Sequence, residues 1–259
     1  MSLLSLSHLT KRFGGLTAVD GVSFDVEDRS VVGLIGPNGA GKTTVFNLIT
    51  GNYQPNEGEI AFDGRRIDGM RTHQIVSLGV ARTFQTIRLF QNMSVLENVL
   101  AGCHCRMKSG VLGGMFRTPG QRREEKEALD RAMEELKFVG LEKYVAHKSR
   151  NLSYGNQRLL EVARALATRP RLLILDEPAG GMNEQETDNL IQLIGSMRDR
   201  GVTVLLIEHD MGLVMEACGH LVVIEYGRKI AEGGPEEIKN DPKVIEAYLG
   251  TEEEEDEDE

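Results

Sequence analysis

Hydrophobic and polar residues alternate in three segments near the start of the chain. Residues 3–9, 18–27 and 58–67 show the two-residue period of strands that bury one face and expose the other. Turn-forming residues lie within or beside these segments, namely Gly21, Asn56, Gly58 and Gly64. The pattern predicts an antiparallel β layer early in the fold.

Continuous apolar runs predict a second set of strands, buried on both faces. The runs are VVGLI at residues 31–35, LLILD at 172–176 and VTVLLI at 202–207. Much of the sequence between the first two runs has a helical pattern. The alternation indicates an α/β fold: a mixed sheet, the antiparallel β layer, and a smaller helical subdomain at about residues 86–167.

Length and composition are typical of one globular unit. A chain of 259 residues with 40% hydrophobic content buries a substantial core, and we expect a single domain over residues 1–250. The sequence has no run of 18 or more apolar residues and no signal-peptide pattern. We therefore expect a cytoplasmic protein that does not itself span a membrane. Its three cysteines form no disulfide framework.

The net charge of −10 is concentrated at the end of the chain. The last eight residues are all acidic, and the other 32 acidic side chains nearly balance the 30 basic ones. Residues 251–259 are therefore predicted to form a solvated, disordered acidic tail. The nearly neutral body argues against nucleic acid as a partner, because nucleic-acid binding needs a basic surface.

The segment GPNGAGKTT follows the first buried run and fits the phosphate-loop pattern G-x-x-x-x-G-K-[ST]. Glycines allow the backbone to turn its N–H groups toward phosphate oxygens, and the helix that follows presents its positive end to the anion. Lys42 supplies a charge for the β- and γ-phosphates, and Thr43 supplies a hydroxyl for Mg²⁺. The predicted nucleotide-binding residues here are Gly36, Pro37, Asn38, Gly39, Ala40, Gly41, Lys42, Thr43 and Thr44.

Asp176 ends the second buried run, and a second carboxylate, Glu177, follows at once. In parallel-sheet nucleotide sites the carboxyl end of a strand is where a Mg²⁺ ligand is placed. The alternative, a solvated acidic turn after a core strand, is disfavoured by the phosphate loop upstream. Asp176 is therefore a predicted metal ligand.

The segment LSYGNQR at residues 152–158, shortly before LLILDEP, resembles the signature motif of ATP-binding cassette (ABC) ATPases. The resemblance implies ATP and Mg²⁺ as cofactors. It also implies that Ser153 and Gly155 open a helix, expected from Gln157, whose start meets the γ-phosphate held by a second subunit. We therefore expect a head-to-tail homodimer, or a heterodimer with a paralogous ABC ATPase. The segment departs from the common LSGGQ form at Tyr154 and Asn156.

The same resemblance assigns roles to four further positions. Glu177 resembles the general base, and His209 resembles the histidine that contacts the γ-phosphate and helps to position the attacking water. Gln85 resembles the loop glutamine that touches Mg²⁺, so the expected metal ligands are Thr43, Gln85 and Asp176. Phe13 lies where the family stacks a ring on adenine; the alternative is an ordinary core or edge aromatic.

Family-specific stretches narrow the resemblance to the ATPase subunits of branched-chain amino acid importers. The stretches are FGGLTAVDGVSF, GVARTFQTIRLFQNMSVLENV, GVLGGMFRTP and GGPEEIKNDPKVIEAYLG, and the resemblance spans about residues 4–250. It implies transmembrane permease subunits, an extracytoplasmic solute-binding protein, and attachment to the inner face of the cell membrane through the permease. The loop after Gln85, with Ile87, Leu89 and Phe90, is expected to contact that permease.

Two other interpretations remain open at this point. One is the ATPase of a lipid or lipopolysaccharide export system; the other is a non-transport cassette protein, acting on ribosomes or DNA or serving as a catalytically silent regulator. The apolar segment around Met115 and the AYLG ending count against the first. The presence of Glu177 and His209 counts against a silent module. For the apolar loop at residues 107–120, packing within the helical lobe is favoured over a partner-binding surface.

Overall fold

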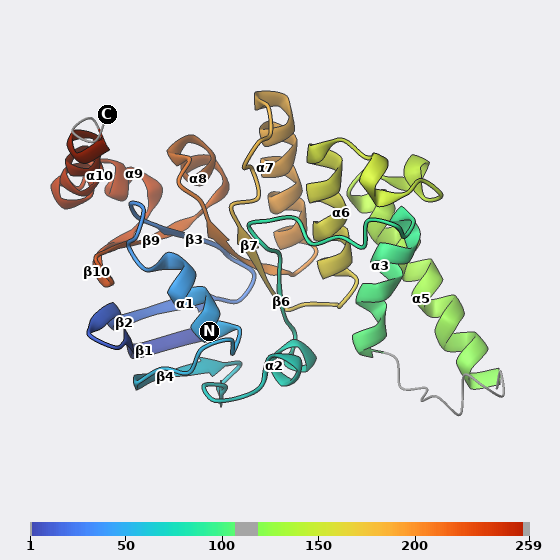
Figure 1. Ribbon diagram of the computed structural model, residues 1–259, viewed down its shortest axis with the longest axis horizontal. Helices are drawn as coiled ribbons and strands as arrows, with labels where there is room; N and C mark the ends of the chain where they lie inside the picture. The colour runs from blue at the N-terminus through green and yellow to red at the C-terminus, as the bar shows by residue number, and fades with distance from the viewer. Residues whose placement is uncertain (1, 107–118, 256–259) are drawn as a thin grey trace.

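The computed structural model describes residues 2–106 and 119–255, which fold around two β-sheets (Figure 1). The smaller sheet is antiparallel, with strand order β2-β1-β4-β5. Its strands are β1 (Ser2–Phe13), β2 (Leu16–Glu27), β4 (Glu57–Phe62) and β5 (Arg65–Arg66). The predicted antiparallel layer is confirmed.

The larger sheet has strand order β10-β9-β3-β8-β7-β6. The strands from β9 to β6 run parallel, and β10 pairs antiparallel with β9, so the sheet is mixed as predicted. The strands are β3 (Val31–Ile35), β6 (Val80–Arg82), β7 (Leu172–Asp176), β8 (Thr203–Ile207), β9 (His220–Glu225) and β10 (Arg228–Gly233).

Each central strand sends alternate side chains into two separate cores, which explains the continuous apolar runs. On β3, Val32 and Leu34 pack with the small sheet and helix α1 (Lys42–Ile49), whereas Val31 and Ile35 pack on the opposite face. Because both faces are covered, a polar residue at any of these positions would be buried. Helix α1 lies between the two sheets, directly after β3, and so meets the carboxyl end of the larger sheet (Figure 1).

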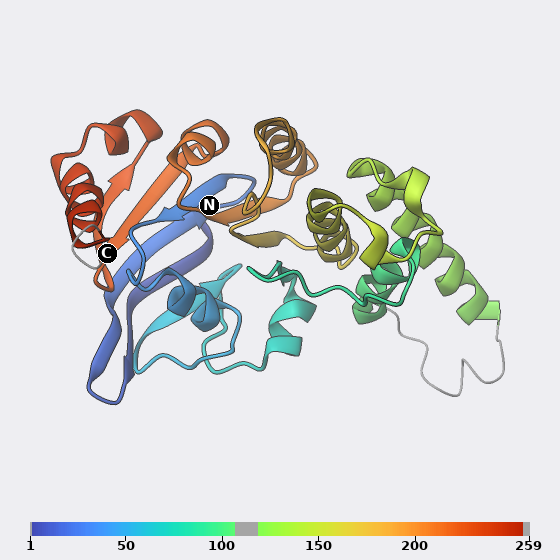
Figure 2. The ribbon, with the colours of Figure 1, turned by 45° about the horizontal axis from the view of Figure 1, so that its top comes forward.

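The opposite face of the large sheet is covered by helices from the second half of the chain (Figure 2). These are α7 (Glu184–Asp199) and α8 (Met211–Ala217), with α9 (Pro235–Lys239) and α10 (Pro242–Glu255) beyond them. Helix α2 (Thr72–Leu78) precedes β6 at the other end of the sheet. Other elements thus pack against both faces of the large sheet.

A helical lobe projects beyond β6 (Figures 1 and 2). Its helices are α3 (Val95–Cys103), α5 (Pro119–Phe138) and α6 (Tyr154–Leu166), and short 3₁₀ turns lie at His104–Arg106, Glu142–Tyr144 and Ser149–Asn151. They fall within the range for which the sequence predicts a helical subdomain. The apolar segment at residues 107–118 lies outside the described residues.

Helix α6 begins three residues earlier than the sequence pattern indicates, at Tyr154 rather than Gln157. The hydroxyl oxygen of Ser153 accepts a hydrogen bond from the backbone N–H of Asn156 at 3.3 Å. This N-cap satisfies one of the donors that a helix start leaves unpaired. The capped turn therefore includes Gly155 and Asn156, which have low intrinsic helix propensity.

The end of the chain bears on the acidic tail that the sequence predicts. Helix α10 continues to Glu255, inside the acidic run, and glutamate has a high helix propensity. Residues 256–259 are not described, and disorder of the tail stays a prediction.

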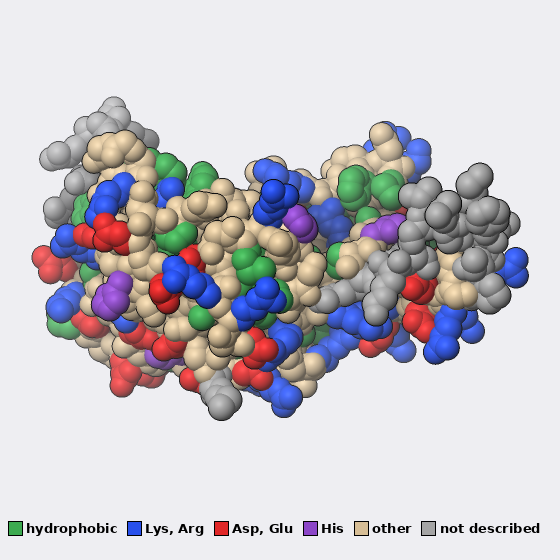
Figure 3. Space-filling model, turned by 90° about the horizontal axis from the view of Figure 1, so that it is seen from below, with side chains coloured by type: hydrophobic (Ala, Val, Ile, Leu, Met, Phe, Trp, Pro, Cys, Tyr) green, Lys and Arg blue, Asp and Glu red, His purple; other side chains and the backbone are tan. Residues whose placement is uncertain are grey.

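Within the described part, no helix has the length and apolarity needed to cross a bilayer. Both basic and acidic side chains occur on the face seen in Figure 3.

Candidate functional site

The phosphate-loop segment lines a cleft of 660 Å³ at the carboxyl end of β3. The cleft brings together five groups of residues far apart in the sequence: the end of β1 and start of β2, the phosphate loop, Gln85, Glu177, and the turn between β9 and β10. Of the predicted binding residues, those that line it are Phe13, Asn38, Gly39, Ala40, Gly41, Lys42, Thr43, Thr44, Gln85 and Glu177.

Two glycines give the phosphate loop its path. Gly36 has φ +149° and Gly41 has φ +102°, which side-chain-bearing residues seldom adopt. A Cβ at Gly36 would collide with the carbonyl oxygen of Ile224, and one at Gly41 with that of Ala18. Gly41 is also the N-cap of α1 and offers no capping side chain. The first N–H groups of α1 therefore remain open to an anion.

Lys42 folds back over the loop that carries it. Its ammonium donates hydrogen bonds to the carbonyl oxygens of Gly36 and Pro37, the latter at 2.8 Å. Burial lowers the pKa of Lys42, and the nearby carboxylate of Glu177 opposes that shift. Both of these hydrogen-bond acceptors are neutral carbonyls, so a phosphate would stabilise the buried ammonium further, because a charged acceptor offsets more of its desolvation.

The side chains of Gln85, Glu177 and His209 converge at the edge of the cleft. The amide nitrogen of Gln85 donates to a carboxylate oxygen of Glu177 at 2.9 Å, and Nδ1 of His209 lies 4.0 Å from the other oxygen. Glu177 has a left-handed backbone, φ +45°, which is rare for a residue with a side chain. These three side chains, each with an expected role in hydrolysis, are thus neighbours in the structure.

Asp176 lies behind this group rather than on the cleft wall. It is buried, and an arginine at the end of β6, Arg82, donates to its carboxylate at 2.9 Å. Burial raises the pKa of Asp176, and the hydrogen bond from Arg82 partly counteracts it. As β6 and β7 are neighbouring parallel strands, their ends bring Arg82 and Asp176 together.

The donor types at this edge fit a hard cation. Mg²⁺ prefers oxygen ligands, and the expected set offers the hydroxyl of Thr43, the amide of Gln85 and the carboxylate of Asp176. Thr43 and Gln85 line the same cleft. The carboxylate of Asp176 lies behind the residues that line the cleft. It would support the cation indirectly from there, or bind it directly after exchanging its contact with Arg82.

Phe13 is a surface aromatic, not a core residue. Its side chain is 41% exposed, and its ring meets that of Tyr53 edge to face, with centroids 5.2 Å apart. The ammonium of Lys11 lies 5.0 Å from the ring centroid. An exposed ring on a cleft wall, flanked by a cation, is suited to stacking on a planar ligand.

Ser153 and Gly155 do not line the cleft. They begin α6 in the helical lobe, where Ser153 caps the helix and Gly155 packs against Glu186 of α7. Within one chain the structure thus does not unite the signature segment with the phosphate loop. Contact of these two residues with a nucleotide held by a second chain stays a prediction.

Sequence reasoning missed several residues of this region. Tyr226 and Gly227 line the cleft, as do Leu16, Thr17 and Ala18. Glu208 is buried beside His209, accepts the N–H of Ala179 at 3.0 Å, and has a pKa raised by burial. A carboxylate directly after a buried strand was the available signal for Glu208.

Leu89, expected to face the permease, is instead buried in the lobe core, whereas Phe90 is 51% exposed.

Two family models match the sequence of this chain. The ABC transporter family model matches residues 19–180, and the model of the branched-chain amino acid ATP-binding cassette transporter matches residues 228–254. The second match includes the AYLG ending, which counts against a lipid exporter.

Individual relatives match along nearly the whole chain. The high-affinity branched-chain amino acid transport ATP-binding protein BraF of Pseudomonas aeruginosa is 52% identical, over 96% of this chain and 98% of its own length. LivG of Escherichia coli K12, with the same description, is 48% identical over the same shares. The ADP conformation of the cassette MJ1267 superposes with a TM-score of 0.85 at 34% identity, covering 96% of this chain and 99% of that one. The chain therefore belongs to the ATP-hydrolysing subunits of ABC transporters, in the group named as branched-chain amino acid transport ATP-binding proteins.

Proposed function

We propose that this chain binds and hydrolyses Mg-ATP to power the uptake of branched-chain amino acids through partner permease subunits. The observation that carries the proposal is the full-length similarity to importer ATPases, combined with a cleft in which Lys42, Gln85 and Glu177 converge. In this role the chain works at the inner face of the cell membrane, held by the permease, and a binding protein outside delivers the solute.

The phosphate loop would hold the nucleotide. The backbone N–H groups of the loop and of the first turn of α1 surround the phosphates, and Lys42 exchanges its two carbonyl partners for phosphate oxygens. Phe13, which lines the same cleft, stacks on the base. Bound Mg²⁺ would neutralise charge on the β- and γ-phosphates, held by Thr43, Gln85 and Asp176.

Glu177 would act as the general base toward the attacking water. Its carboxylate lies on the cleft wall, where a proton acceptor is needed for attack in line with the bond that breaks. Gln85 and His209 flank the two carboxylate oxygens and restrict the orientation of the group. Orientation of this kind lowers the barrier because the reacting groups are already placed.

Hydrolysis in this scheme needs a dimer. Ser153 and Gly155 begin a helix of 13 residues, α6, and lie away from the chain's own cleft. Two chains arranged head to tail would apply this helix start to the nucleotide in the opposite cleft, where its dipole favours the γ-phosphate. The partner in the dimer is a second copy or a paralogous ATPase subunit.

A groove beside α2 fits the permease contact. It has a volume of 340 Å³ and is lined by Ile75 and Val76 of α2 and by Phe84, among others. Two guanidinium groups flank the Phe84 ring, Arg82 at 5.3 Å and Arg88 at 4.5 Å. Apolar walls with cationic edges suit a short amphipathic helix of a membrane subunit. Because Phe84 directly precedes Gln85, such a helix would bear on the catalytic edge.

The test is solute-stimulated ATPase activity of the chain assembled with its permease subunits and binding protein. Leucine, isoleucine and valine should stimulate hydrolysis, unrelated amino acids should not, and Glu177→Gln should abolish the response. Stimulation by none of the three, with basal hydrolysis intact, would leave the ATPase assignment standing and remove the solute assignment.

A further inference from the structure

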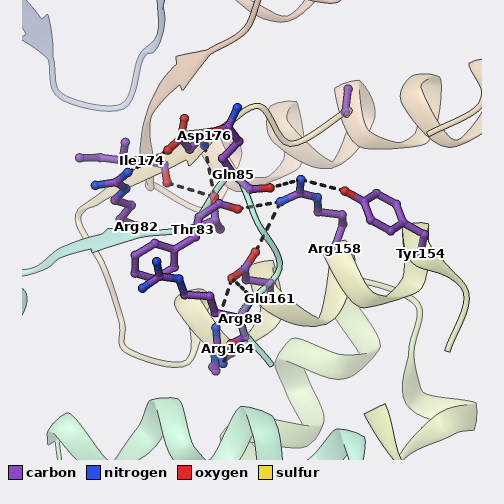
Figure 4. Close-up of polar contacts among 12 residues, drawn as sticks. Arg82, Thr83, Gln85, Arg88, Tyr154, Arg158, Glu161, Arg164, Ile174 and Asp176 are labelled. Carbon is purple, nitrogen blue, oxygen red and sulfur yellow. Dashed lines mark hydrogen bonds and ion pairs between the residues drawn. The ribbon is translucent and has the colours of Figure 1, made fainter. Parts of the chain in front are cut away.

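Arg158, in the second turn of α6, holds the loop that carries Gln85 (Figure 4). The side chain of Arg158 is only 6% exposed. Its guanidinium donates to the carbonyl oxygen of Phe84 at 2.7 Å, to the carbonyl oxygen of Gln85, and to the hydroxyl of Tyr154 at 3.0 Å. One side chain of α6 thus fixes the backbone of Gln85 and of the residue before it.

Two more side chains of α6 hold the other end of the same loop. A carboxylate oxygen of Glu161 accepts the backbone N–H of Arg88 at 3.3 Å, and Arg164 lies 3.3 Å from that oxygen. Arg164 also donates to the carbonyl oxygen of Arg88. Residues 84–88 are therefore fastened to α6 from both ends, and Gln85 lies between the attachments.

This network is costly to bury. Glu161 is 2% exposed, and burial raises its pKa despite the nearby arginines. Buried ion pairs often add little to stability compared with apolar residues of similar volume. A network that fixes one short loop beside the catalytic carboxylate is better explained by the geometry it imposes than by the stability it contributes.

Tyr154 connects the same arginine to the loop after Glu177. A Cβ at Gly181 would lie 3.0 Å from the Tyr154 ring, so the ring packs against that loop. Its hydroxyl accepts from Arg158. The tyrosine that departs from the common signature form thus has a structural role here: it touches the segment downstream of the general base while it supports the arginine that holds Gln85.

We propose that Arg158 is a positioning residue for hydrolysis, acting through Gln85. It holds the loop backbone so that the Gln85 amide faces Glu177. Arg158 lies in α6, the helix that begins at Ser153 and Gly155. If nucleotide bound to the partner chain displaces this helix start, Arg158 would pass the displacement to Gln85. Gln85 would pass it to Glu177, the general base of the same chain. The inference rests on the proposed function, since it requires the two-chain hydrolysis site.

The test is a double-mutant cycle between Arg158→Lys and Gln85→Ala, measured as ATP turnover in the assembled transporter. Lysine keeps the positive charge beside Glu161 but lacks the planar fork that reaches two carbonyl oxygens at once. Arg158→Lys should lower kcat about tenfold to a hundredfold, with the KM for ATP changed less than about threefold. The double variant should be no slower than Gln85→Ala alone, because both changes remove the same placement.

Two further variants provide a second test and a control. Tyr154→Phe removes only the hydroxyl that accepts from Arg158, on a half-exposed ring, and should fold normally; its smaller loss, about twofold to fivefold, should also disappear in the Gln85→Ala background. Arg123→Ala, on an exposed arginine of α5 in the same lobe, is the control and should leave kcat unchanged.

The outcomes separate this inference from the proposed function. Multiplicative losses in the cycle, or a rise in KM without a fall in kcat, would overturn the positioning role while leaving the ATPase assignment intact. An assembled transporter whose unmodified ATPase chain does not hydrolyse ATP would overturn the proposed function, and the inference with it.

Discussion

The amide nitrogen of Gln85 donates a hydrogen bond of 2.9 Å to the carboxylate of Glu177. The two residues lie 92 positions apart in the sequence, each just beyond the end of one of two adjacent parallel strands, β6 and β7. Gln85 belongs to a loop fastened to the helical lobe, whereas Glu177 extends directly from the large sheet. Their contact therefore links the helical lobe to the carboxylate of Glu177, the group that we propose as the general base.

The first prediction concerns the carboxylate of Glu177. Glu177→Gln keeps the shape and the contact with Gln85 but removes the proton acceptor, so turnover should fall by about a hundredfold to a thousandfold. Nucleotide binding should persist, because the phosphate loop is untouched, and the variant should accumulate as an ATP-bound dimer. The checks are ATPase rate in the assembled transporter and size-exclusion chromatography with ATP.

The matched control is Glu184→Gln, which makes the same change at an exposed carboxylate in the first turn of α7. It should hydrolyse ATP at the unmodified rate. Undiminished turnover of Glu177→Gln would show that another group accepts the proton from water, and the assignment of the base would have to be given up.

The parts of the site that the sequence predicts are those encoded by consecutive residues. The strand β3, the phosphate loop and helix α1 form one continuous stretch, so a local pattern is enough to place Lys42 and Thr43. Asp176 and Glu177 are predictable for the same reason, because Asp176 ends the strand β7 and Glu177 is the next residue.

The parts that the sequence does not predict depend on which strands and helices become neighbours. Arg82 reaches Asp176 only because β6 pairs beside β7, with Arg82 opposite Ile174 in the register. Arg158 reaches Phe84 only because α6 packs against the segment after β6. Both arginines lie in motifs quoted from the sequence, but the motifs do not reveal their partners, because each partner is more than 70 residues away.

A pair of glycine substitutions tests the path of the phosphate loop. Gly36→Ala should lower the free energy of unfolding by about 2 kcal/mol or more and weaken nucleotide binding, because its Cβ collides with the carbonyl oxygen of Ile224. Gly195→Ala should raise that free energy by about 0.5–1 kcal/mol, since Gly195 lies inside α7 with nothing within 4 Å of an added Cβ. Urea unfolding and titration with a fluorescent nucleotide measure both effects. Normal nucleotide affinity in Gly36→Ala would contradict the tight packing of this turn.

The three thiols should differ sharply in reactivity. Cys218 is 5% exposed, and burial raises its pKa to about 12, so very little thiolate forms near pH 8. Burial also raises the pKa of Cys103, whereas Cys105 is exposed. A chromogenic disulfide reagent should label one thiol rapidly in the native protein and all three after unfolding. Cys105→Ser should remove the rapid phase, and its persistence in that variant would contradict the burial of the other two.

The last prediction concerns the acid stability of the hairpin formed by β4 and β5. Asp68 is desolvated, which by itself raises its pKa, but hydrogen bonds from Arg66 at 2.9 Å and from the backbone N–H of Ile60 at 3.1 Å outweigh this and lower it. A carboxyl whose pKa is lower in the folded state stabilises that state at pH values above its unfolded pKa, near 3.9. The contribution is lost as the pH falls through the lower, folded pKa.

Asp68→Asn should therefore cost about 1 kcal/mol at pH 7, a value limited by the exposure of Arg66, whose side chain is 58% exposed. The difference from the unmodified protein should shrink as the pH is lowered from 4 toward 2. Urea unfolding at a series of pH values measures it, with Asp188→Asn, an exposed site on α7, as the control. A difference that stays constant or grows on acidification would mean that the charge of Asp68 does not stabilise the hairpin, and that only the shape of its side chain matters there.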